Sequence, residues 1–358
     1  MKHYLYLNLL LAFALLAYSC NESGNGEGEE ITEPKTLDDS IQMLSDQIRQ
    51  NPHDAALFVQ RSDLQFINGN LDEAINDMEI AMKVDSTKPP YYSKLASLYM
   101  FKANGSEKAK EVLNKCINRY PSYPQAHIDL AKIFLYVGMF QEAMQEIQFL
   151  EINNLQNGDS YFVRGIILRK ASETESDTAN TRQWKRDALA AFKKAVEYDN
   201  ENWEAYNLIG VSLTELGDSI ALEYFKTATS KFPDNQEIKY WNGWSLRNFG
   251  RYEKAKDTYI EVAQMDSASY WTFLAYSDLG DMYSTISLEP DKYNTAINYY
   301  SSAIACDTTA FETYVKRGDA YAQNKQYQLA EADYRKALKL ETNYDPAIDG
   351  LNRIAGKR

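Results

Sequence analysis

The sequence predicts an all-α protein in which about eight helical hairpins follow one another along the chain, with a capping helix at each end. Two observations support this fold class. Glycine and proline, the residues that most often interrupt helices, number only 16 and 9 among 358 residues. Small and large apolar residues also recur in register about every 34 residues, and such a fixed period is the signature of a repeat array.

Three columns of residues define the period. Alanines stand at Ala74, Ala109, Ala143, Ala188, Ala221, Ala255, Ala296 and Ala330. Upstream small residues stand at Ser62, Ala96, Ala131, Gly165, Gly210, Gly243, Gly280 and Gly318. Large apolar residues follow the alanines at Met78, Leu113, Ile147, Phe192, Phe225, Tyr259, Tyr300 and Tyr334. Such spacing makes one apolar stripe on a helix, and small residues let a second helix approach closely, so each period predicts a hairpin.

This pattern resembles the tetratricopeptide repeat, a helical hairpin of about 34 residues with fixed small and aromatic positions. The resemblance extends from about Ala55 to Tyr344, and the segment from Thr313 to Ala337 matches most closely. It implies that the hairpins stack into a right-handed superhelical solenoid. Two stretches with extra residues, 172–184 and 284–293, are expected to be loops that join the two helices of a repeat.

The first 19 residues predict a lipoprotein signal peptide. A basic start is followed by an apolar run from Tyr4 to Tyr18, and small residues precede Cys20. This arrangement resembles the lipobox of bacterial lipoproteins, which implies that Cys20 is diacylated and becomes the mature N-terminus. An ordinary signal peptide cleaved after Ser19 is the alternative.

The segment 20–35 is glycine-rich and acidic, which predicts a flexible tether. Asn21 replaces the aspartate that retains lipoproteins in the inner membrane, so the outer membrane is favoured, on its periplasmic face or at the cell surface. Acidic residues in the tether loosely resemble the export signals of Bacteroidota lipoproteins. The remaining chain is expected to hold an N-terminal capping helix in 36–52, the repeat array in 53–343, and a C-terminal capping helix and tail in 344–358.

The composition argues against enzymatic and nucleic-acid functions. The sequence contains no nucleophile elbow, phosphate-binding loop, dinucleotide fingerprint or metal-spaced cluster, and it has only three histidines and three cysteines. We therefore expect no catalytic residue, no metal and no cofactor. The formal net charge of −13 disfavours binding to nucleic acid, which requires a basic surface.

The family resemblance implies a concave wall formed by the first helix of each repeat. Its wall positions hold aromatic and basic residues of the types that dominate binding at interfaces. These candidate groove residues are Lys132, Tyr136, Phe162, Arg169, Lys170, Tyr240, Trp241, Trp244 and Arg247. Because two neighbouring tryptophans would expose a large apolar patch, either a partner or an adjacent repeat should cover Trp241 and Trp244. The family's clamp for C-terminal carboxylates is not expected, since its asparagine position holds Asp63, Asp281 and Asp319 in three repeats.

These features predict a non-enzymatic scaffold, anchored by lipid at Cys20, that binds protein or peptide partners of an envelope machine. Two alternatives stay open. The aromatic wall suits binding of glycan or peptidoglycan, and paired carboxylates in the groove would suit a hydrolase.

Overall fold

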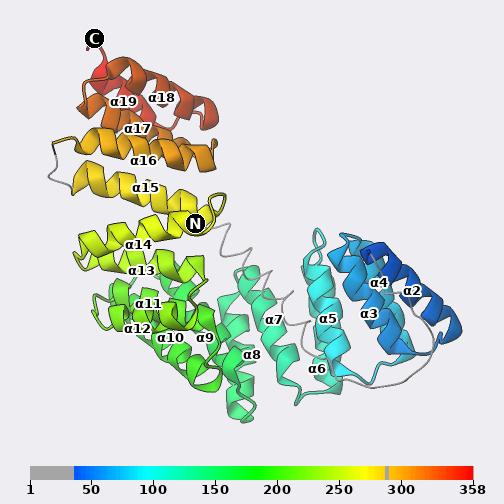
Figure 1. Cartoon of the computed structure of the whole chain (residues 1–358). Coiled ribbons are helices and arrows are strands. Elements are labelled where there is room, and N and C mark those ends of the chain that lie inside the picture. The colour runs from blue at the N-terminus through cyan, green and yellow to red at the C-terminus, as the bar shows by residue number, and fades with distance from the viewer. Residues whose placement is uncertain (1–35, 287–289, 358) are drawn as a thin grey trace. The chain divides into compact units, whose positions relative to one another are not determined.

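The computed structural model describes residues 36–286 and 290–357, which form eighteen α-helices and no strand (Figure 1). The terminal helices are α2 (Leu37–Gln50) and α19 (Asp345–Ile354). Between them, consecutive helices pair as hairpins: α3 (Ala55–Ile67) with α4 (Leu71–Val84), α5 (Pro89–Met100) with α6 (Ser106–Arg119), α7 (Pro124–Tyr136) with α8 (Phe140–Ile152), α9 (Gly158–Thr174) with α10 (Thr178–Tyr198), α11 (Trp203–Glu215) with α12 (Ala221–Lys231), α13 (Gln236–Asn248) with α14 (Tyr252–Met265), α15 (Tyr270–Thr285) with α16 (Lys292–Cys306), and α17 (Phe311–Gln323) with α18 (Tyr327–Leu340). The prediction of an all-α array of eight hairpins between two terminal helices is confirmed.

The chain divides into two compact units, the first ending at Tyr198 and the second beginning at Asp199. The first unit holds α2–α10 and the second holds α11–α19, whose helices follow one another in chain order in Figure 1. The repeat spacing does not predict this division. Cys20 and the segments 1–19 and 20–35 lie outside the described residues. Among the described helices, none has both the length and the apolar character needed to cross a membrane.

Each hairpin closes where a small residue of its first helix meets a large side chain of its second. In the α13–α14 hairpin, a Cβ atom added to Gly243 would lie 2.8 Å from Cε1 of Tyr259, a ring with no exposed surface. Gly210 and Gly280 meet Phe225 and Tyr300 in the same way, at 2.6 and 2.5 Å. These helices therefore approach so closely that glycine is required opposite the ring.

The first three repeats use a different combination of sizes at the same two positions. Their small residues are Ser62, Ala96 and Ala131, and the large residues are Met78, Leu113 and Ile147, all of them buried. A slightly larger residue on the first helix thus goes with an aliphatic side chain instead of a ring on the second. The total volume of the pair is roughly kept, as close packing of a core requires.

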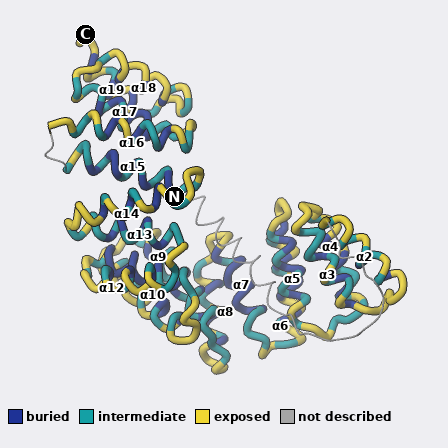
Figure 2. The backbone as a smooth tube through the Cα atoms, viewed as in Figure 1, coloured by how far each residue is buried: buried dark blue, intermediate teal, exposed yellow. Residues whose placement is uncertain are grey.

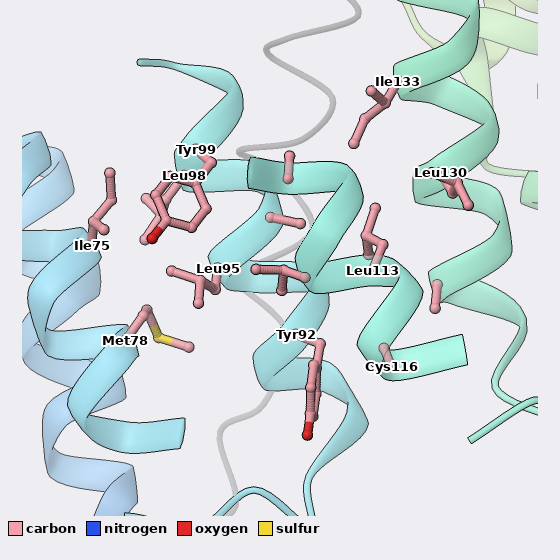
Figure 3. Close-up of a cluster of buried hydrophobic side chains, with 14 of the residues drawn as sticks. Ile75, Met78, Tyr92, Leu95, Leu98, Tyr99, Leu113, Cys116, Leu130 and Ile133 are labelled. Atoms are coloured by element: carbon pink, nitrogen blue, oxygen red, sulfur yellow. The ribbon is translucent and has the colours of Figure 1, made fainter. Parts of the chain in front are cut away.

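The core of the first unit continues from one hairpin to the next. Figure 3 shows Met78 of α4, Leu95 of α5, Leu113 of α6 and Leu130 of α7 in one buried cluster. Figure 2 shows buried residues along the helices and exposed residues at the turns between them. Each repeat therefore covers the apolar face of its neighbour, which is why an array needs terminal helices.

The first and last repeats share an arginine–aspartate clamp. Arg61 donates from Nε and Nη2 to the two carboxylate oxygens of Asp77, at 2.8 and 2.6 Å, and from Nη1 to Oγ of Ser45, at 3.0 Å. The equivalent residues of the last repeat are Arg317, Asp333 and Ser301, with distances of 2.8, 2.8 and 3.0 Å. Both aspartates are buried, so each bidentate pair holds three helices together with charge-assisted hydrogen bonds.

The extra residues 172–184 lengthen two helices rather than form the expected loop. Helix α9 continues to Thr174 and α10 starts at Thr178, so the two helices have 17 and 21 residues. The expectation of a loop is therefore wrong for most of this stretch. In the second stretch, 284–293, α15 ends at Thr285 and α16 begins at Lys292.

We predict that Gly243→Ala destabilises the protein although alanine is the better helix former by about 1 kcal/mol. The added methyl group would press on the buried Tyr259 ring, and such overpacking typically costs about 1–3 kcal/mol. Chemical denaturation followed by circular dichroism measures the loss. The double variant Gly243→Ala, Tyr259→Leu carries the pair found at Ala96 and Leu113, so its loss should be smaller than the sum of the two single losses. Simple additivity would contradict the proposed contact.

Candidate functional site

The predicted groove residues of the first unit differ in exposure. Tyr136 is 44% exposed at the end of α7, whereas Phe162, Arg169 and Lys170 of α9 are only partly exposed. Lys132 is buried, 8% exposed, which corrects the expectation that it lies on an open wall. The physical reason is its attraction to the buried carboxylate of Asp129, one helical turn away.

In the second unit, Tyr240 and Arg247 are engaged by the following repeat. The hydroxyl of Tyr240 donates to Oδ2 of Asp278 in α15, at 2.9 Å, and Arg247 donates from Nη1 to Oδ1 of the same carboxylate, at 2.8 Å. Tyr240 is only 7% exposed, so it belongs to the core rather than to a binding wall. The guanidinium of Arg247, a candidate groove residue, thus already has a carboxylate partner within the chain.

Trp241 and Trp244 lie in an aromatic cluster that spans adjacent repeats. The ring of Trp241 is 5.5 Å from that of Trp244 and 6.3 Å from that of Trp271, measured between centroids. Trp203 of α11 packs against the same core cluster as both residues. All these tryptophans remain partly exposed. A neighbouring repeat therefore covers part of the apolar patch, and a role for the remainder in binding stays a prediction.

Glu237 is a residue of this region that the sequence reasoning missed. It lies in the first turn of α13, and its Oε1 accepts a hydrogen bond at 3.2 Å from Nδ2 of Asn207, which is 3% exposed. Trp241, one turn later, also hydrogen-bonds to the carboxylate. The sequence held one indication of this site, because Glu204 and Glu237 occupy the same position of consecutive repeats.

The carboxylate of Glu237 has an unusual electrostatic environment. Desolvation raises the pKa of Glu237 from 4.5 to about 7; the hydrogen bond from Trp241 lowers it, and the nearby charge of Glu204 raises it further. No described lysine or arginine forms an ion pair with Glu237. Near neutral pH this side chain therefore changes charge at a partly buried position. Among the described residues, no group of three histidine, cysteine or acidic side chains could hold a metal ion.

We predict that Glu237→Gln stabilises the protein at pH 8 and has little effect at pH 5. A carboxyl whose folded pKa is raised binds more protons in the native state, so the wild type loses stability as pH rises from about 4.5 to above 7. The neutral amide avoids this loss, which we expect to be on the order of 2 kcal/mol at pH 8. Denaturation curves between pH 5 and pH 8 measure the difference.

Glu312→Gln is the matched control for this prediction. Glu312 occupies the same repeat position in the last repeat and is exposed, so its neutralisation should not show the same dependence on pH. A stability difference between Glu237→Gln and the wild type that is equal at pH 5 and pH 8 would contradict the raised pKa of Glu237.

Comparison with known proteins identifies the repeats. Residues 92–123, 219–270 and 311–344 match family models described as tetratricopeptide repeat. The mitochondrial import receptor subunit TOM34 of Homo sapiens is 27% identical over 130 residues, which are 35% of this chain and 40% of that protein. The chain thus matches less than half the length of this curated relative.

Two solved structures are similar in fold. One is the APC/C hetero-tetramer Cut9–Hcn1, with 16% identity and a TM-score of 0.54 over 97% of this chain and 62% of the solved chain. The other is the C-terminal part of a repeat-containing protein from Cytophaga hutchinsonii, with 18% identity and a TM-score of 0.51 over 74% of this chain and 99% of the solved chain. At these identities the likeness supports the fold alone. Together with the hairpins and the three matched segments, it shows that this chain contains tetratricopeptide repeats.

Proposed function

We propose that this chain is a non-enzymatic, lipid-anchored adaptor of a bacterial cell envelope that binds protein partners along its first helices. One observation carries the proposal. Ile67, Phe101 and Tyr136 occupy the same position in the first three repeats, at or just after the end of the first helix, and are 60%, 36% and 44% exposed. We call these three residues the apolar row.

The first two repeats contact each other beside the apolar row. The ring of Phe101 lies 4.8 Å from the ring of Phe66, the neighbour of Ile67 in the preceding repeat. Large apolar side chains exposed in register on consecutive hairpins are typical of a surface that a protein partner covers. TOM34, which is similar to this chain over 40% of its own length, is named as a receptor subunit. This name agrees with protein binding as the proposed role.

Glycan binding is the weaker alternative. It would depend on tryptophan faces open to a sugar ring, and the edge contacts of Trp241 with Trp244 and Trp271 leave only part of each indole exposed. A hydrolase has less support still, because Glu237, an acidic residue with a raised pKa, hydrogen-bonds to an asparagine and a tryptophan.

The apolar row can be tested by photo-crosslinking in cells. Phe101 replaced by p-benzoylphenylalanine should form discrete adducts with a partner protein, because this position lies within the proposed contact. The same replacement at Ile152 is the control, since Ile152 is 79% exposed at the end of a second helix, away from the row. The proposal would be contradicted if position 101 formed no adducts, or if positions 101 and 152 formed the same set of adducts.

Lipid attachment is tested separately. Metabolic labelling with a fatty-acid probe should mark the wild type and leave Cys20→Ala unlabelled, and the variant should move from the membrane to the soluble fraction. The loss should be complete because stable anchoring needs two acyl chains and both would depend on this residue. Equal labelling of the two proteins would rule out the anchor at Cys20.

A further inference from the structure

Several carboxylates of the described residues that are removed from water pair with a cation, whereas Glu237 does not. Asp77 and Asp333 accept bidentate hydrogen bonds from Arg61 and Arg317. Asp278 pairs with Arg247. Glu237 has only the neutral donors of Asn207 and Trp241, in a setting that desolvates it. A carboxylate removed from water without a cation is unfavourable, so its presence needs a reason other than stability.

The side chain of Asn207 carries an acceptor without a hydrogen-bond partner next to Glu237. Its Nδ2 donates to Glu237, while its Oδ1 is buried and has no hydrogen-bond partner. Buried polar atoms are rarely left unsatisfied in native proteins, and an exception calls for an explanation. Both atoms belong to one amide, so the unsatisfied acceptor lies close to the Glu237 carboxylate.

The chemistry of these groups selects a cation that carries several N–H donors. Glu237 and Oδ1 of Asn207 are both acceptors, and a lysine ammonium or an arginine guanidinium can donate to the two at once. The partly exposed indole of Trp241, with Trp244 beside it, adds an aromatic surface of the kind that attracts organic cations. A metal ion fits less well, because the described residues offer no group of three ionisable ligands.

We propose that Glu237, Asn207 and Trp241 form a subsite that receives a lysine or arginine side chain of a partner protein. The proposal rests on the protein-binding function proposed above and adds the chemistry of one contact in the second unit. The formal net charge of −13 supports a basic partner segment, since an acidic chain attracts it over longer distances. A clamp for a C-terminal carboxylate is basic, whereas this subsite is acidic and would receive a basic side chain.

Defined peptide libraries test the subsite on the immobilised full chain. The probes are nine-residue peptides with degenerate flanks and a central residue fixed as lysine, arginine, norleucine or glutamate. We expect the wild type to retain lysine- and arginine-centred peptides about tenfold better than norleucine-centred ones, a difference of about 1.4 kcal/mol. Glu237→Gln should lose most of this preference. Glu312→Gln removes one exposed charge at the same repeat position and should keep it.

The outcomes separate this proposal from the adaptor function. Peptides that bind without a preference for a central cation, or with a preference that Glu237→Gln retains, would overturn the subsite and leave the adaptor function standing. A wild type that retains no peptide from any library would overturn the subsite and also count against protein binding. Circular dichroism melting of each variant confirms that it is folded before it is compared.

Discussion

The close contact between a small residue of the first helix and a large side chain of the second sets the geometry on which the rest of the structure depends. It fixes how near the two helices of a hairpin lie, and so which residues of the first helix point away from the core. The same contact extends to the C-terminal end of the array. The ring of Tyr334 lies between Gly318 of its own repeat and Gly350 of α19, where added Cβ atoms would come within 2.8 and 2.5 Å of Cε1. The terminal helix is therefore held by the interaction that closes the hairpins.

Ion pairs between arginines and aspartates are a second feature that recurs across the array. Arginines pair with Asp77, Asp278 and Asp333, and these ion pairs join helices of the same or neighbouring repeats. Removing one partner from such a pair leaves an uncompensated charge, which makes the pairs structurally necessary without making them strongly stabilising overall. Glu237 departs from the regularity, and local departures of this kind are expected where a protein has retained a group for binding at the expense of stability.

The hairpins could be predicted from the sequence because the contacts that define them are local and repeat in register. Gly243 and Tyr259 lie within one repeat, and their spacing alone indicates that two helices meet there. The environment of Tyr240 and Arg247 could not be predicted in this way, because their partner Asp278 comes from the next repeat. The position of a residue within its repeat predicts which side of the helix the residue occupies. It does not predict which side chain of the adjacent hairpin faces that residue. Glu237 was missed for the same reason, since Asn207 belongs to the preceding repeat.

The arginine–aspartate clamps of Arg61 and Arg317 have a consequence for how the array opens. In a linear array each repeat contacts only its neighbours, so the terminal repeats have the least support and ordinarily fray first. Here the same three-residue device stands in the first and the last repeat and ties each to the helix that precedes it. The clamps thus stand in the two repeats that have a neighbouring repeat on one side only. Because both aspartates are buried, fraying of a terminal repeat has to separate a charge pair as well as an apolar surface.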